Sequence, residues 1–183
     1  MVRSDTATRG SSGFIGRAVL LAGWIGLTDL WLKTMARAGG CTDAPGLAKL
    51  LENPWVIPNN CPGRPLLGEA VLLAPAVRDG GPFGVLAPSL SGATGETWGF
   101  VVLGLAAVLT VLVARWRWRD PGDILALGVL WGGCLVLALP RVLGDGTGVT
   151  ELTVAGIGVG IGELTVAWAL AWLAWRFVAE ARA

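Results

Sequence analysis

The chain has 183 residues, of which 54% are hydrophobic and only 15% are charged, and its net charge is +1. A soluble domain usually carries about 25% charged residues, so the composition predicts a membrane protein and offers no basic surplus for binding nucleic acid. The sequence contains no histidine and no tyrosine, which excludes Ser-His-Asp catalysis and His-ligated haem or zinc. We therefore expect neither a metal nor a cofactor.

Four apolar stretches, separated by charged or Gly/Pro-rich segments, predict four transmembrane helices in a single membrane domain. Residues 1–13 are mostly polar and small and are predicted to form a disordered tail. The expected spans are residues 14–32, 97–114, 124–140 and 153–178. The expected fold class is therefore an all-α membrane protein.

Residues 33–96, between the first two expected spans, differ in kind from the rest of the chain. They contain most of the prolines and several short apolar pieces joined by Gly-rich turns. This pattern is typical of short strands. We expect a small β-containing cap outside the membrane.

Two of the three cysteines, Cys41 and Cys61, lie in this cap. They are natural disulfide partners if the cap faces an oxidising compartment; the alternative is two unrelated thiols. Cys134 lies within the third expected span and is interpreted as a small buried apolar residue.

The arginines indicate how the chain crosses the membrane. They gather in the tail before Arg17, in the turn after the second span at residues 115–119, and at residues 176–182. Four spans place these three segments on one side, and short basic segments mark the cytoplasmic side. Both termini are then cytoplasmic and the cap lies outside.

Four ionisable residues lie in or next to the expected hydrocarbon region. Asp29 and Lys33 are four residues apart and could pair on one helical face. Arg141 follows the third span, and Glu163 lies inside the fourth, where a carboxyl group needs a partner or must be protonated. We interpret Glu163 as functionally or structurally important, with Arg141 as a candidate partner.

The fourth expected span also contains two G-x-x-x-G spacings, Gly156 with Gly160 and Gly158 with Gly162. Such spacings allow helices to approach closely in lipid. They predict tight packing of this helix and no particular activity.

The order of these segments resembles lipoprotein signal peptidase (signal peptidase II), a bacterial family with four spans, cytoplasmic termini and an outer cradle after the first span. Asp29 and Lys33 match the family's D-x-x-x-K at the end of that span. Residues 78–84 resemble its N-x-G-x-A-F-G loop, with Asp79 in place of the Asn and Phe83 at the aromatic position. The resemblance implies the bacterial cytoplasmic (inner) membrane as the location.

Three further motifs follow in the family's order. Residues 132–141 resemble G-G-A-x-G-N-x-x-D-R, residues 148–151 are similar to G-x-V-D, and residues 160–163 stand where N-x-A-D would open the last span. Members of the family are aspartic proteases that cleave the signal peptide from lipid-modified prolipoproteins. Their two catalytic aspartates correspond to Pro140 and Glu163 in this chain.

An aspartic protease needs two carboxyl groups that share a proton, one as base and one as acid. Proline cannot supply one, so the resemblance implies a non-catalytic relative that contacts membrane lipids. Such a relative would bind a lipoprotein or act as an accessory subunit of a membrane complex. The positions with expected binding or structural roles are Asp29, Lys33, Asp79, Phe83, Arg141 and Glu163.

Other functions require other features of the sequence. An active peptidase would need a rearranged carboxyl pair, Glu163 with Asp145 or Glu151. A four-span thiol oxidoreductase would fit the topology, but there is no C-x-x-C motif to relay electrons. A channel or transporter is poorly supported, because only Glu163 would line a path.

Overall fold

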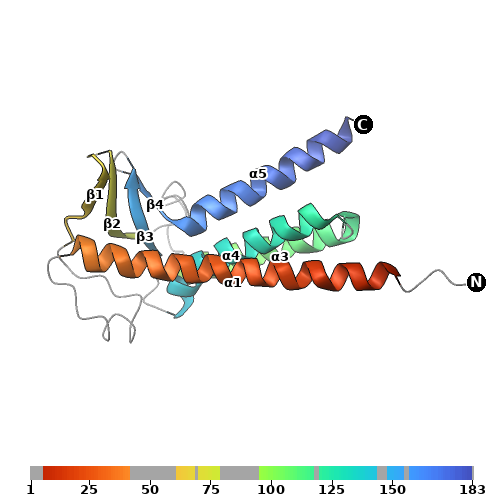
Figure 1. Ribbon diagram of the computed structural model, residues 1–183, viewed down its shortest axis with the longest axis horizontal. Helices are drawn as coiled ribbons and strands as arrows, with labels where there is room; N and C mark the ends of the chain where they lie inside the picture. Colours follow the sequence, from red (N-terminus) through yellow and green to blue (C-terminus); the bar gives the residue numbers. More distant parts are fainter. Residues whose placement is uncertain are drawn as a thin grey trace, which may run out of the picture.

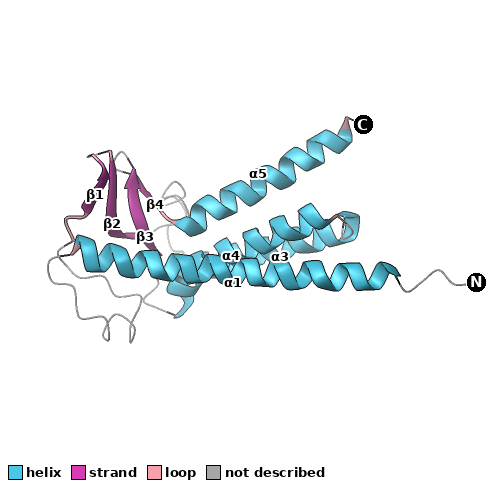
Figure 2. Ribbon diagram, in the orientation of Figure 1, coloured by secondary structure: helices cyan, strands magenta, loops and turns pink. Residues whose placement is uncertain are grey.

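In the computed structural model, the described residues are 6–41, 61–68, 70–78, 95–117, 120–143, 148–154 and 157–182. Four long helices run side by side and a small sheet covers one end of them (Figures 1 and 2). The helices are α1 (Thr6–Gly40), α3 (Gly95–Arg117), α4 (Pro121–Leu143) and α5 (Ile161–Ala181). Each contains a segment long and apolar enough to cross a membrane. The chain is a polytopic membrane protein with four membrane-spanning helices.

Helix α4 is the centre of the bundle, because it contacts each of the other three helices. About two-thirds of its span is buried inside the protein, against 17% for each of the others. Two glycines explain its close approach to α1. A Cβ atom on Gly128 would lie 2.7 Å from the carbonyl oxygen of Ala18, and one on Gly132 would lie 3.0 Å from the Cα of Ala22.

The contact between α4 and α5 also depends on small residues. A Cβ atom on Gly133 would lie 2.8 Å from the carbonyl oxygen of Gly162. On the opposite side, the indole nitrogen of Trp131 donates a hydrogen bond to the hydroxyl of Thr110 on α3, at 2.9 Å. Backbones that approach this closely gain van der Waals contact, which is the main source of helix association in lipid.

The cap is a four-stranded antiparallel sheet in the order β1-β2-β3-β4. Strands β1 (Arg64–Leu67) and β2 (Val71–Arg78) come from the segment between α1 and α3. Strands β3 (Gly148–Val154) and β4 (Ile157–Val159) come from the segment between α4 and α5. The prediction of a β-containing cap is confirmed, although half of its strands lie outside the segment from which it was predicted.

The ladder between β2 and β3 has a register shift between Leu73 and Ala76. Pro75, which lies within this shift, has no N–H to donate to the neighbouring strand, so the regular ladder is interrupted there. Pairing resumes and ends with Arg78 opposite Gly148.

Several predicted boundaries were wrong. The backbone is already helical from Thr6, within the segment predicted to be a disordered tail, and α1 continues to Gly40 rather than ending at residue 32. A helix of this length spans about 50 Å, well beyond the roughly 30 Å hydrocarbon core. Its last part contacts β2 and β3, and this packing keeps it helical beyond the membrane.

The third and fourth spans also differ from the prediction. Helix α4 continues through Pro140 to Leu143, although Pro140 cannot donate a backbone hydrogen bond and its ring crowds the carbonyl four residues earlier. The fourth span begins at Ile161, not at residue 153. Gly158 lies in β4 and Gly160 is the residue before α5, so the predicted G-x-x-x-G spacing does not lie on the helix. The predicted tight packing is confirmed at Gly162, where a Cβ atom would lie 2.8 Å from Cγ1 of Val136. The contact with α1 depends instead on Gly128 and Gly132 of α4.

Candidate functional site

Five charged side chains are buried where the helices meet the sheet, and we call them the cap-end charges. They come from three helices: Asp29, Lys33 and Arg37 from α1, Arg141 from α4, and Glu163 from α5. None of them is more than 3% exposed. A charge removed from water costs several kcal/mol unless it is compensated, so this grouping is the strongest candidate for a functional site.

The α1 charges form a row along one face of the helix. Asp29, Lys33 and Arg37 are spaced four residues apart, so their side chains follow one another along one side. The carboxylate of Asp29 and the ammonium of Lys33 form an ion pair through Oδ2 of Asp29, as the sequence predicted. The other oxygen, Oδ1, is buried and makes no hydrogen bond within the described part of the chain.

Arg37 was missed by the sequence analysis, although it is fully buried. The signal that could have found it is the spacing from Lys33, which repeats the four-residue step from Asp29. It was overlooked because the helix was expected to end at residue 32.

Arg141 lies in the last turn of α4, next to Pro140. Its guanidinium folds back along the helix, and Nη1 donates a hydrogen bond to the carbonyl oxygen of Leu137 at 2.6 Å. A cation at a helix C-terminus also interacts favourably with the helix dipole. The geometry therefore gives Arg141 a structural role at the end of its helix.

Glu163 occupies the third position of α5 and caps that helix. Its Oε2 accepts a hydrogen bond from the backbone N–H of Gly160 at 3.2 Å, which is the glutamate half of a capping box. The positive end of the helix dipole stabilises a carboxylate there. This gives a buried carboxylate a structural explanation that the sequence analysis did not reach.

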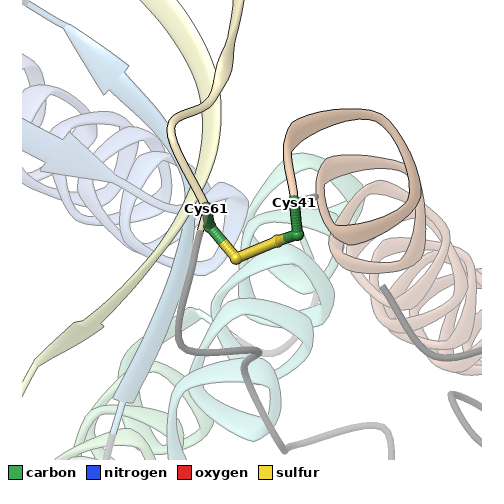
Figure 3. The surroundings of a disulfide bond; sticks show 2 residues. All are labelled: Cys41 and Cys61. Atoms are coloured by element: carbon green, nitrogen blue, oxygen red, sulfur yellow. A yellow bond between two sulfur atoms is a disulfide. The ribbon is translucent and has the colours of Figure 1, made fainter. Parts of the chain in front are cut away.

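Cys41 and Cys61 form a disulfide that joins the end of α1 to the start of the sheet (Figure 3). Cys41 directly follows α1, and its N–H donates to the carbonyl oxygen of Arg37 at 3.2 Å. The predicted pairing is confirmed, and it fixes the α1 charges relative to β1. Cys134 is a buried free thiol on α4, as expected.

Some of the predicted site residues belong to parts of the chain that the structure does not describe. Asp79, Phe83 and Asp145 lie outside the described residues, and so does the side chain of Glu151, whose backbone belongs to β3. Among the residues that are described, no group of three or more His, Cys, Asp or Glu side chains could hold a metal ion.

A second charged group lies at the opposite end of the bundle. Arg176 on α5 pairs with Asp120, and its Nε lies 3.6 Å from Oδ1 of Asp123. Asp120 also caps α4, because its Oδ1 accepts a hydrogen bond from the N–H of Gly122 at 2.8 Å. We call Asp120, Asp123 and Arg176 the opposite-end charges.

The protein is a bundle of four membrane-spanning helices with a disulfide-bonded cap and a group of charged residues at each end. Its similarity to known proteins is a similarity of fold. No family model and no curated protein matches the sequence. Two solved structures, each described as a bacterial membrane enzyme determined by the in meso method, superpose on nearly the whole chain. One has a TM-score of 0.64 at 14% sequence identity, and the alignment covers 92% of this chain and 91% of the chain in that structure. The other has a TM-score of 0.62 at 13% identity, with 90% and 94% covered.

Proposed function

We propose that this protein is a non-catalytic relative of lipoprotein signal peptidase that binds a lipid-modified peptide or acts as an accessory subunit of a membrane complex. The observation that carries the proposal is the chemistry of the two positions that correspond to the family's catalytic aspartates. One is Pro140, which is buried in α4 and has no ionisable group. The other is Glu163, whose carboxylate caps its own helix.

The fold supports this reading. The likeness to two bacterial membrane enzymes extends over nine-tenths of the chain, so a membrane-enzyme scaffold is combined here with an incomplete carboxyl pair. A scaffold that keeps its shape without its catalytic groups can still bind a substrate-like ligand. Membrane lipids are the other expected partners.

Cleavage and binding should be measured separately. Purified, affinity-tagged protein in detergent is mixed with a fluorescent, lipid-modified prolipoprotein, and cleavage and retention on the affinity resin are followed together. We expect retention without cleavage, for the wild type and for Glu163→Gln alike. Glutamine is the matched change, because it can also form the second half of a capping box.

Cleavage by the wild type that disappears in Glu163→Gln would contradict the proposal. It would favour an active peptidase in which Glu163 works with Asp145 or Glu151. Absence of both cleavage and binding would favour the accessory role, and isolation of the intact membrane complex would then identify the other subunits.

The proposed location is the bacterial inner membrane, with both termini in the cytoplasm. The N-terminus of α1 and the C-terminus of α5 lie at the end of the bundle opposite the sheet (Figure 1). Arg17 belongs to the N-terminal half of α1, Arg115 to the last turn of α3 and Arg176 to the C-terminal half of α5, and short basic segments favour the cytoplasm. A disulfide persists in an oxidising compartment, which supports a cap outside the cytoplasm. Alkaline phosphatase fused to the C-terminus should be inactive, whereas a fluorescent protein fused there should fluoresce. The reverse result would contradict this orientation.

A further inference from the structure

The side of α1 that faces away from the other helices carries a row of large apolar side chains. The opposite side, which includes Ile25 and Asp29, is buried against the bundle. The members of the row are each more than half exposed and follow one another at steps of four, three and four residues: Leu20, Trp24, Leu27 and Trp31. Alternating steps of three and four are the repeat by which two helices pack along a seam. We call these four residues the α1 seam.

The seam contains a notch of about 450 Å³ that is lined by four residues of α1: Trp24, Leu27, Thr28 and Trp31. In a pair of parallel helices, a side chain of one helix inserts into a hole formed by four residues of the other, spaced as these are. The notch therefore has the form of such a hole. The side chain that would fill it belongs to a facing helix and lies at the height of Leu27.

A second copy of this chain has a suitable side chain at that height. Two copies inserted in one membrane with the same orientation are related by a twofold axis along the membrane normal, so each residue faces its own height in the other copy. Leu27 of the second copy would then enter the notch. Gly23 adds a second match, because a Cβ atom there would meet nothing within 4 Å. The Trp24 ring of the second copy would find open space beside it, so the face is complementary to itself.

Trp24 also leaves this face in need of a hydrogen-bond acceptor. Gly132, the middle residue of α4, is in contact with Ala22, so Trp24 lies about 3 Å from the middle of the bundle. Its indole N–H makes no hydrogen bond within the described part of the chain, whereas that of Trp131, at a similar depth, donates to Thr110. Lipid tails offer no acceptor, and an unpaired polar group in hydrocarbon costs free energy. A facing helix offers one, because a glycine leaves backbone carbonyls uncovered and each carbonyl oxygen has two lone pairs.

From the seam, its notch and this donor, we infer that the outward face of α1 binds a second copy of the chain, with the two α1 helices parallel. Leu27 of each copy inserts between Trp24 and Trp31 of the other. The indole N–H of Trp24 donates to a backbone carbonyl beside Gly23 of the other copy. This dimer goes beyond the proposed function, because it requires neither a lipoprotein nor a further subunit.

Self-association is measured by energy transfer between full-length copies that carry donor or acceptor dyes on a C-terminal tag, in liposomes at decreasing protein-to-lipid ratios. Gly23→Leu fills the space beside Trp24, and we expect it to raise the Kd of the dimer about tenfold. Gly104→Leu is the matched control, because Gly104 on α3 has equally open surroundings and lies off the seam; it should leave the Kd unchanged. Energy transfer no greater than random proximity gives, or a dimer indifferent to Gly23→Leu, would overturn the proposal.

The hydrogen bond is tested with Trp24→Phe, which removes the N–H and keeps an aromatic ring. The dimer contains two such bonds, one from each copy, so its Kd should rise about eightfold. Trp175→Phe removes an indole N–H from an exposed position near the end of α5 and should have no effect. Equal Kd values for the wild type and Trp24→Phe would remove this bond from the interface.

The register is tested by cross-linking. Leu27→Cys places a thiol on the seam, and a short bismaleimide should join two copies of this variant. The wild type should not react, because Cys134 is buried, and neither should Leu105→Cys, whose thiol lies on the exposed face of α3. Cross-linking of Leu105→Cys in preference to Leu27→Cys would move the contact to α3 and contradict the proposal. None of these results bears on the retention of a prolipoprotein, which is measured by its own assay.

Discussion

The two ends of the helical bundle hold charged residues in opposite ways. The cap-end charges are almost completely removed from solvent by α1, α4, α5 and the sheet. At the opposite end, Arg176 and Asp120 keep 28% and 35% of their side-chain surface exposed, and only Asp123 of the opposite-end charges is buried. Exposed pairs contribute little to stability, whereas loss of one partner from a buried pair leaves an uncompensated charge. The same residue types should therefore have very different energetic weight at the two ends.

The largest effect is expected from Lys33→Met, which leaves the Asp29 carboxylate buried without its ion-pair partner. We expect a loss of about 4 kcal/mol in the free energy of unfolding. Unfolding in detergent can be followed with a thiol-reactive dye, because the free Cys134 is buried in the folded protein. The Asp29→Leu/Lys33→Met double variant should recover more than half of the loss. A double variant as unstable as the single one would show that the pair is not the cause.

The disulfide should have the next largest effect, because it holds the cap-end charges against the sheet. Cys41 and Cys61 are 20 residues apart, and closing a loop of this length stabilises a protein by about 3 kcal/mol in the chain-entropy model. The Cys41→Ser/Cys61→Ser variant should lose this amount in a thermal unfolding assay. Reducing agent should lower the unfolding temperature of the wild type to that of the variant. If the two proteins already unfold together without reductant, the disulfide contributes nothing.

Between the two ends, Gly128→Ala in the contact between α1 and α4 should lower the free energy of unfolding by an intermediate amount, and no charge is involved. The added methyl group in Gly128→Ala would meet the backbone of Ala18, and such overpacking costs about 2 kcal/mol. Gly104→Ala is the control, because its Cβ would meet nothing within 4 Å. Equal unfolding temperatures for the two variants would mean that α1 and α4 can move apart without cost.

The smallest effect is expected from Arg176→Gln at the opposite end. Its pair with Asp120 should account for less than about 1 kcal/mol of the loss, and this part should shrink further as salt is added, since partly exposed pairs are screened. The buried Asp123 should add a part that does not depend on salt. Unfolding measured at low and high ionic strength checks both points. A loss as large as that of Lys33→Met would remove the distinction between the two ends.

The four spans could be predicted from the sequence because lipid requires about 20 consecutive apolar residues. The exact ends could not, because they depend on contacts made elsewhere in the chain. Lys33 and Arg37 suit the end of a membrane helix, so they give no local signal that α1 continues to Gly40 and contacts the sheet. Gly158 and Gly162 have the G-x-x-x-G spacing of a packed helix, yet Gly158 lies in a strand that pairs with β3.

The candidate site could be predicted in part for the same reason. The four-residue step between Asp29 and Lys33 is a local signal, and it correctly predicted their ion pair. The burial of Arg37 and the capping role of Glu163 depend on where α1 ends and where α5 begins. Neither position can be read from local composition, because both are set by the pairing of strands from two distant loops.

That pairing also imposes an order on biosynthesis. Strand β2 is complete once Arg78 has been made, but its partner opposite that residue, Gly148, follows about 70 residues later. At roughly 5–20 residues per second, the delay is roughly 4 to 14 seconds, during which α3 and α4 must be made. Through this interval β2 presents an open strand edge, which is the kind of surface that recruits wrong partners. The ribosome thus finishes the cap only after most of the bundle exists, so insertion of α4 is a precondition for closing the sheet.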